Sequence, residues 1–232
     1  MNNDKKIYSK LENFPIMFFA SIMGFSGLTI SYILLNRIYE VSDTIFILLK
    51  FLTTGLFLVV FIFYVAKFLK YPHEVKKDLV HPIKINFFGA FTISLLLLSI
   101  IWHDDKIFYA PFYYLGLITQ TALTFYVIVF WIKNPISIKF MNPTAFIPIV
   151  GNLIVVIAGD GEYLWYHFSI GIFFWIVLFV IIFYRLIFEE KLMSKFMPTL
   201  FIMLAPPAVA FLGIVKLTGE FGTLSYIFLS LT

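Results

Sequence analysis

The 232-residue chain is too apolar for a soluble domain: 61% of its residues are hydrophobic and 13% are charged, whereas soluble domains carry about a quarter charged residues. The absence of cysteine excludes disulfides, thiolate metal sites and cysteine nucleophiles. The pI near 9.1 does not indicate nucleic-acid binding, because the lysines lie in short connections between apolar runs. The composition therefore predicts an all-α integral membrane protein.

The apolar runs predict the transmembrane spans, since about 20 helical residues cross the hydrocarbon core of a bilayer. The first run lacks a small-residue cleavage site and is expected to be a retained helix. We expect one transmembrane domain over residues 1–232, with a partial eighth span from Phe221 to Thr232. The seven complete spans are predicted at 15–34, 44–69, 82–101, 109–132, 143–158, 163–188 and 198–214.

The basic residues predict the orientation of these spans. Thirteen of the seventeen Lys and Arg residues fall on the side that carries the N-terminus, among them Lys5, Lys6 and Lys10. By the positive-inside rule, that side is cytoplasmic. The expected location is the cell inner (plasma) membrane, with the N-terminus in the cytoplasm.

A repeat of helical hairpins organises the chain. The odd-numbered spans open alike, at Phe14-Pro15, His81-Pro82, Asn142-Pro143 and Met197-Pro198. Proline suits a first helical turn, because its missing N–H would be unpaired there in any case. Each odd span then carries a helix-weakening residue, namely Gly24, Gly89, Gly151 and Pro206. Repeated units in transporters commonly surround a central path.

Polar and small residues are about twice as dense in the odd spans as in the even ones, which fits either tight helix packing or a pore lining. For any single residue both interpretations stay open, while the repeat as a whole favours a pore. The pore-lining candidates are Phe19, Gly24, Phe25, Gly27, Gly89, Phe91, Thr92, Ser94, Gly151, Asn152 and Pro206. Among them, the phenylalanines are candidates for narrowing the pore by excluding water.

Two charged features favour structural roles. Lys50, inside an even span, is expected to reach the membrane interface with its ammonium group. His103-Asp104-Asp105 has no matching ligand set elsewhere, so a solvated loop is expected and no metal site.

The segments that open the odd spans resemble the tellurite-resistance/dicarboxylate transporter family, which includes the plant slow-anion channels. The resemblance rests on the order and spacing of Phe14-Pro15 to Leu28, His81-Pro82 to Ser94, Asn142-Pro143-Thr144 with Gly151-Asn152, and Pro198 to Ala210. It implies ten helices in five hairpins with pseudo-fivefold symmetry, an inner ring of odd helices around a pore, and a homotrimer. It also implies a phenylalanine gate on a ninth helix. This chain stops within the eighth, so we expect a C-terminally truncated relative that conducts anions poorly or not at all.

The expected function is passive transport of small inorganic or organic anions across the lipid bilayer. No odd span carries a buried carboxylate of the kind that relays protons in coupled carriers. The family also suggests a proton-linked C4-dicarboxylate carrier or a sulfite or tellurium-oxyanion exporter, and a non-conducting remnant is a third possibility. No retinal lysine or intramembrane protease motif is present, so neither an enzyme nor a cofactor is expected.

Overall fold

The computed structural model describes residues 11–39 and 41–232, and every regular element in these ranges is helical. Six stretches within them are long and apolar enough to cross a membrane. The chain is therefore a multi-pass membrane protein. Lys5, Lys6 and Lys10, which contribute to the predicted orientation, lie outside the described residues.

The even spans are long, unbroken helices close to their predicted positions: α3 (Asp43–Lys70), α6 (Lys106–Lys133) and α9 (Leu164–Phe188). Their apolar residues continue around most of the helix surface, which suits a helix that faces lipid. At the start of α6, the Asp105 carboxylate accepts a hydrogen bond from the backbone N–H of Ile107 at 3.1 Å. This cap satisfies one of the free donors of the helix terminus.

The odd spans are less regular. The first is α2 (Phe18–Tyr39), which begins three residues after Pro15, and the others each begin with a 3₁₀ segment before turning α-helical. Proline cannot donate the hydrogen bonds of a regular α-helix, and 3₁₀ turns are common at helix starts. These three spans consist of η1 (Lys84–Phe87) with α5 (Phe88–Ile101), of η3 (Pro143–Phe146) with α7 (Ile147–Val150) and α8 (Asn152–Ala158), and of η4 (Ser194–Met203) with α10 (Ala205–Thr218).

The prediction of a single continuous helix over 143–158 is wrong, because this segment is divided into three pieces. Its backbone changes from 3₁₀ to α-helix at Ile147 and turns again at Gly151. None of its three pieces reaches the length of a spanning helix, so it is absent from the six spanning stretches among the described residues. The shorter elements are α4 (Pro72–Leu79), η2 (Ile138–Phe140) and α11 (Thr223–Ser230), and α11 occupies the predicted partial eighth span.

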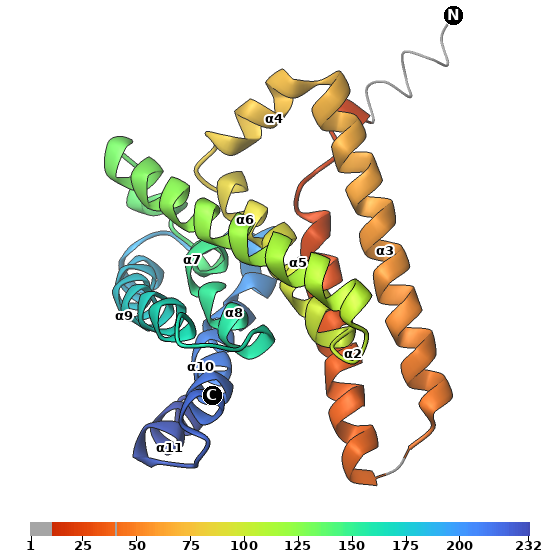
Figure 1. Ribbon diagram of the computed structural model, residues 1–232. Helices are drawn as coiled ribbons and strands as arrows, with labels where there is room; N and C mark the ends of the chain where they lie inside the picture. Colours follow the sequence, from red (N-terminus) through yellow and green to blue (C-terminus); the bar gives the residue numbers. More distant parts are fainter. Residues whose placement is uncertain (1–10, 40) are drawn as a thin grey trace, which may run out of the picture.

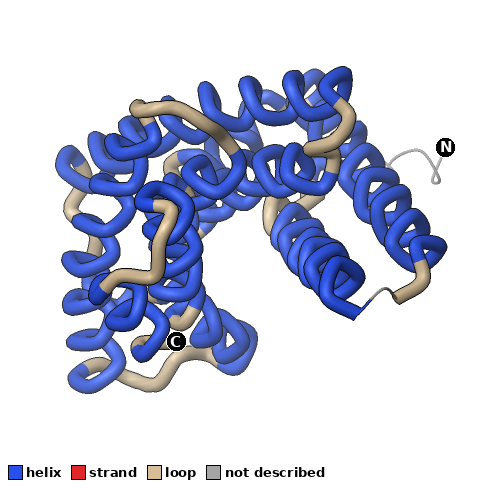
Figure 2. The backbone as a smooth tube through the Cα atoms, turned by 60° about the horizontal axis from the view of Figure 1, so that its bottom comes forward, coloured by secondary structure: helices blue, strands red, loops and turns tan. Residues whose placement is uncertain are grey.

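The helices form an open arc. Helix α2 packs against α3 and α5, α5 packs in turn against α6 and α8, and α10 packs against α8, α9 and α11. Figure 1 shows α2 and α3 side by side, with α4 across the upper end of the molecule. Figure 2 shows the α2–α3 hairpin at one end of the arc and α11 near the other.

Burial follows position in the arc. In the η1–α5 span 72% of the residues are buried, against 22% in an 18-residue stretch of α2, although both are odd spans. The difference arises because α5 has neighbours on several sides, whereas α2 ends the arc.

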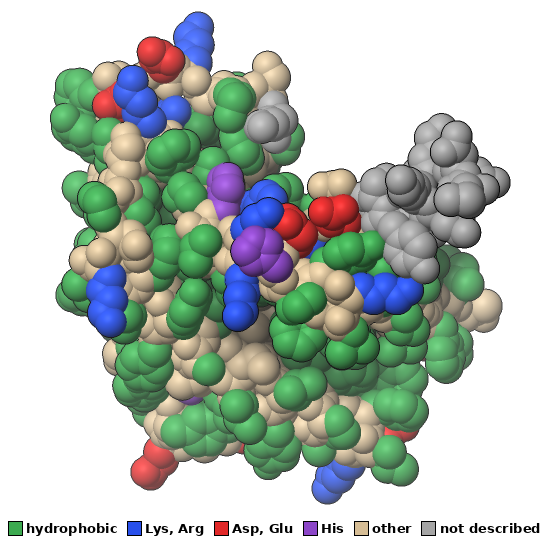
Figure 3. All heavy atoms as spheres, turned by 90° about the horizontal axis from the view of Figure 1, so that it is seen from above, with side chains coloured by type: hydrophobic (Ala, Val, Ile, Leu, Met, Phe, Trp, Pro, Cys, Tyr) green, Lys and Arg blue, Asp and Glu red, His purple; other side chains and the backbone are tan. Residues whose placement is uncertain are grey.

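The two ends of the helices differ in charge. The upper end in Figure 1, which α4 crosses, carries most of the described basic residues and is called here the lysine-rich face. Viewed from above, this face shows basic, acidic and histidine side chains among apolar ones (Figure 3). The opposite end carries Arg37, Lys106 and Lys216.

Candidate functional site

A cavity of about 320 Å³ lies between the four odd spans. Every residue of its lining belongs to one of these spans, and none belongs to α3, α6 or α9. The lining residues are Met23 and Gly27 of α2, Ile93 and Leu97 of α5, Phe146, Ile147, Val150, Gly151 and Ile154 of the broken span, and Ile202, Ala205, Pro206 and Val209 of the last span. This central cavity is the candidate functional site.

The wall of the central cavity is apolar. No charged or hydroxyl-bearing side chain lines it. Where Pro206 meets the cavity, α10 begins with Ala205, Pro206 and Pro207, and the two prolines have no N–H to offer an anion. The wall therefore has no built site for tight anion binding, and its main effect on an ion is the removal of hydration water.

Three of the predicted pore-lining residues lie on this wall: Gly27, Gly151 and Pro206. At Gly27 an added Cβ would meet nothing within 4 Å, whereas at Gly151 it would come within 2.7 Å of the Ile93 side chain. Gly27 therefore keeps the cavity open, while Gly151 permits α5 to approach the broken span closely.

The three predicted phenylalanines lie elsewhere. The rings of Phe19 and Phe91 are 5.1 Å apart and both contact Phe57 of α3, so they belong to the interface of α2, α3 and α5. Phe25 is exposed on α2. The phenylalanine on the cavity wall is Phe146, in the 3₁₀ segment that the sequence-based helix assignment did not foresee.

The remaining candidates are distributed between packing contacts and the exposed surface. Gly24 is exposed, and a Cβ added to Gly89 would lie 2.7 Å from the Pro148 Cα, so Gly89 lets two backbones touch. The Thr92 hydroxyl donates to the Gly89 carbonyl at 3.0 Å and also contacts the Gln120 side chain. The Ser94 hydroxyl lies 2.6 Å from the Ala90 carbonyl and 3.2 Å from the Phe19 carbonyl.

Asn152 belongs to a buried polar network that braces the broken span. Its side-chain amide donates to the Thr124 hydroxyl at 2.8 Å, and its carbonyl oxygen lies 2.8 Å from Nδ1 of His167. The Gln120 amide and the Thr124 hydroxyl both donate to the Pro148 carbonyl, at 2.8 and 3.1 Å. These side chains stabilise the carbonyl ends of α7, where the helix stops.

The sequence did not lead us to expect inward-facing polar side chains at Gln120, Thr124 and His167, because the even spans were expected to face lipid. The available signal was their spacing: the buried residues of α6 form one stripe, Tyr113, Gly116, Gln120, Thr124 and Val127. Side chains three and four positions apart share a helix face, so this stripe marks the face of α6 that packs on the inner helices.

A second polar cluster lies at the lysine-rich face. Asp78 of α4 accepts from the Lys67 ammonium and from the Lys84 ammonium, each at 2.6 Å, and Lys67 also donates to the Phe14 carbonyl at 2.9 Å. Burial would raise the pKa of the Asp78 carboxyl, but the hydrogen bonds and charges of the two lysines hold that pKa below its usual value. The cluster joins α3, α4, η1 and the segment before α2.

Lys50 and His103 both lie against aromatic rings, and the centre of the His103 ring is 5.4 Å from that of Tyr109. The Lys50 ammonium lies 3.8 Å from the centre of the Trp102 ring, a cation–π contact, and the Trp102 indole donates to the Thr54 hydroxyl at 3.0 Å. Among the described residues, no group of three or more His, Cys, Asp or Glu side chains is placed to hold a metal ion.

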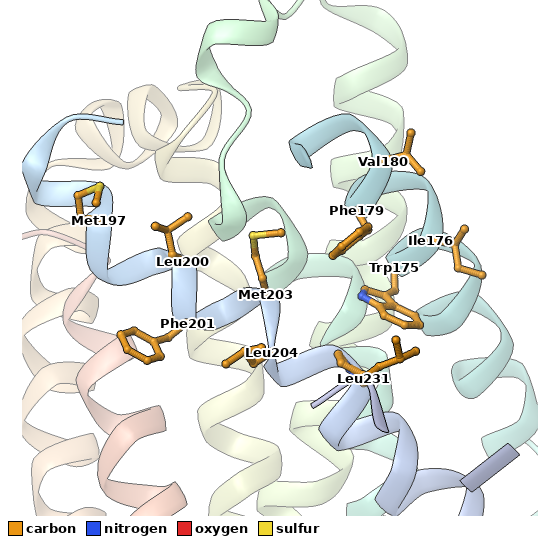
Figure 4. A pocket seen from close by; sticks show the side chains of 11 residues that line it. Trp175, Ile176, Phe179, Val180, Met197, Leu200, Phe201, Met203, Leu204 and Leu231 are labelled. Atoms are coloured by element: carbon orange, nitrogen blue, oxygen red, sulfur yellow. The ribbon is translucent and has the colours of Figure 1, made fainter. Parts of the chain in front are cut away.

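A larger apolar groove, of about 820 Å³, lies outside the central cavity. In Figure 4, Trp175 and Phe179 of α9 face Met203 at the end of η4 and Leu204, which follows it, with Leu231 below them. Because an even helix forms one wall and only one of the odd spans contributes to the other, this groove is a poorer candidate for an anion path than the central cavity, which all four odd spans line.

The sequence of this chain matches a known family and several known membrane proteins. A family model described as voltage-dependent anion channel (SLAC1) matches residues 13–230. An uncharacterized transporter of Methanocaldococcus jannaschii is 24% identical over 91% of this chain and 67% of its own length. From Arabidopsis thaliana, the S-type anion channel SLAH3 is 29% identical over 94% of this chain. The guard cell S-type anion channel SLAC1 of the same plant is 22% identical over 91%. This chain spans 36% and 41% of the lengths of these two plant channels.

Proposed function

Because this chain belongs to the voltage-dependent anion channel family, we propose that its four odd spans form most of a passive path for small anions. The observation that carries the proposal is the lining of the central cavity, to which all four odd spans contribute and no even span does. The S-type anion channels among its relatives support the choice of anions as the permeant species. The resemblance to these channels also supports a homotrimer as the assembled form.

The apolar wall supports weak binding of anions. An anion crossing the cavity loses hydration water and gains no buried basic partner, so large, weakly hydrated anions cross most easily. Weak binding permits fast exit, which conduction requires. Among the described residues of the wall there is no carboxylate that would relay a proton, which favours flow down the electrochemical gradient over proton coupling.

The second candidate is a proton-linked carrier of C4-dicarboxylates, or an exporter of sulfite or tellurium oxyanions. The observation in its favour is His167, a buried titratable side chain bonded to Asn152, which directly follows the wall residue Gly151. An imidazole in this position would couple the broken span to a proton.

The test is anion flux into liposomes that contain the purified chain. We expect little or no nitrate or chloride uptake by this chain alone, and any uptake should follow the membrane potential and be unchanged by an imposed pH gradient. Flux that requires the pH gradient, and that is lost in His167→Gln, would identify the coupled carrier instead. In parallel, a version extended by the C-terminal helices of a relative shows whether a chain whose arc is open between α2 and α10 conducts by itself.

Gly27→Trp tests the path directly, because its side chain would enter the space of the central cavity. We expect the flux through the extended version to fall at least tenfold while the protein still folds. The control is Leu58→Trp, at an exposed position of α3, which should leave the flux unchanged. Equal flux in both variants would exclude the central cavity as the path.

A further inference from the structure

A groove of about 290 Å³ lies on the outer surface between the end of α6, the 136–141 connection and α9. Its walls are entirely apolar, and its residues are Trp131, Ile136, Ile138, Met141, Phe174, Val177, Leu178 and Ile181. The α9 residues lie three, four and seven positions after Phe174, so they form one continuous face of that helix.

Three basic residues lie close in the sequence to the lining of this groove. Lys133 follows Trp131 by two residues, Lys139 is next to Ile138, and Arg185 lies one helical turn beyond Ile181 on the same face of α9. The 136–141 connection passes the end of α9, because the Lys139 ammonium is 4.0 Å from the Glu189 carboxylate, one turn beyond Arg185. The groove is thus apolar along its length and basic at the lysine-rich face.

Arg185 is the unusual member of this set. It is 94% buried, with 6% of its surface exposed, and its Nε and Nη1 atoms have no hydrogen-bond partner. None of the ion pairs among the described residues includes Arg185, and Glu189, one turn further along α9, pairs with Lys139. A buried guanidinium without a counter-ion is costly. A turn of the side chain toward the groove, where an acceptor from outside the chain can meet it, would therefore stabilise it.

We propose that this groove binds an anionic phospholipid. The phosphate of the lipid accepts hydrogen bonds from Arg185, whose planar fork matches phosphate geometry. Lys133 and Lys139 add attraction at the rim, and one acyl chain lies against the apolar walls. A free inorganic phosphate would use the basic end alone and leave the apolar length of the groove unexplained. A second copy of the chain would bring two basic sets together. Basic sites between transmembrane helices are typical places for anionic lipid headgroups.

The test measures the melting temperature of the full chain in detergent by tryptophan fluorescence. The added probes are phosphatidylglycerol, phosphatidylcholine or inorganic phosphate. We expect phosphatidylglycerol to raise the melting temperature by several degrees more than phosphatidylcholine, with no effect of phosphate. Arg185→Gln should remove this difference between the lipids. Arg37→Gln, which loses the same charge at an exposed position on the opposite end, should retain it.

Two further variants keep the proposal testable if Arg185→Gln does not fold. Ile181→Trp fills the groove without changing its charge and should also abolish the lipid difference. The double variant Lys133→Gln with Lys139→Gln changes exposed side chains and should reduce it by at least half. The proposal would be overturned if both lipids raised the melting temperature equally, or if Arg37→Gln removed the lipid difference as fully as Arg185→Gln. It would also be overturned if inorganic phosphate raised the melting temperature as much as phosphatidylglycerol. None of these readouts depends on anion flux, so they test the groove independently of the proposed function.

Discussion

At the scale of single residues, the carbonyl of Pro148 shows how the break in the 143–158 span is stabilised. It accepts hydrogen bonds from Gln120 and Thr124, both on α6. A helix end leaves carbonyls without backbone donors, and in a membrane there is no water to satisfy them. Polar side chains on an even helix thus hold the irregular backbone that lines the central cavity.

Replacing Thr124 by valine should therefore destabilise the protein. The substitution keeps the shape but removes the hydroxyl that donates to Pro148 and accepts from Asn152. Unpairing buried polar groups costs about 1–3 kcal/mol, measurable as a lower melting temperature in detergent. The matched control is Thr121→Val, because the Thr121 hydroxyl bonds only the Leu117 carbonyl of its own helix. Equal losses in the two variants would show that the cross-helix bonds contribute nothing.

Substitution by alanine should have opposite effects on thermal stability at Gly89 and at Gly27. A Cβ at position 89 would lie 2.7 Å from the backbone of Pro148, which cannot move aside without shifting the broken span. At position 27 it meets open space, and alanine in a helix interior gains about 0.5–1 kcal/mol over glycine. Thermal unfolding should give a lower midpoint for Gly89→Ala and an unchanged or higher one for Gly27→Ala. A tolerated Gly89→Ala would mean that α5 and the 143–158 span are not in close contact.

The sequence distinguished the residues that line the central cavity from those that pack against neighbouring helices only in part. Glycine and proline in odd spans were expected at the pore, and Gly27, Gly151 and Pro206 do line the central cavity. Gly89 and Ser94 have the same residue types and the same kind of span, but they face neighbouring helices. Which face of an irregular segment points inward depends on its 3₁₀ turns, and these shift the helical phase in a way that composition does not reveal.

At the scale of elements, the Lys67, Asp78 and Lys84 cluster fixes the connection between the first two hairpins. Asp78 on the short helix α4 bridges a lysine of α3 and a lysine of η1. Lys67 is 3% exposed, so its ammonium depends on Asp78 and on the Phe14 carbonyl for compensation. Lys67 was one of the thirteen basic residues that the sequence analysis used only to orient the spans, and Asp78 was given no role. Their pairing could not be predicted, because it joins residues of different elements.

Asp78→Asn should weaken this connection by about 3 kcal/mol, as expected when one partner of a buried ion pair is lost. The pKa of the carboxyl is lowered in the folded protein. Its contribution is therefore complete above the ordinary aspartate pKa of about 4 and disappears as the pH falls toward the folded pKa. Melting curves of wild type and variant should differ at neutral pH and converge in acid. The control Glu74→Gln removes a surface pair with Lys77 and should change little at any pH.

The continuous elements were predictable and the broken ones were not. The predicted boundaries of the even spans lie within a few residues of α3, α6 and α9, because length and hydrophobicity determine a lipid-facing helix. The proline and glycine pattern located the irregular positions of the odd spans. It could not give their geometry, since the breaks near Gly151 and Leu204 depend on contacts with neighbouring helices.

At the scale of the whole molecule, the arc places the two sets of connections at opposite ends. Positions 76 and 104 are both exposed, the first on α4 and the second between α5 and α6. With no native cysteine, Lys76→Cys and Asp104→Cys can be compared without background labelling. If the lysine-rich face is cytoplasmic, a membrane-impermeant thiol reagent added to intact cells should label position 104 and spare position 76. The reverse labelling would invert the proposed orientation.

Sequence reasoning reached the family and the helical class of the whole molecule, and the match over residues 13–230 confirms the resemblance. The expected closed ring with pseudo-fivefold symmetry stays a prediction, because the described helices form an arc in which α2 and α10 pack against different partners. Repeats in a sequence reveal that units are alike, whereas the closure of a ring depends on the angle between them.

The central position of α5 has a mechanical consequence. A chain drawn out of a bilayer by its two ends loses the elements with the fewest neighbours first. Here these are α2–α3 on one side and α10–α11 on the other, each anchored to the rest mainly along one flank. The α5–α6 hairpin, held from several directions, would rupture last and at the highest force. The order of extraction would therefore follow position in the arc, from its edges to its middle.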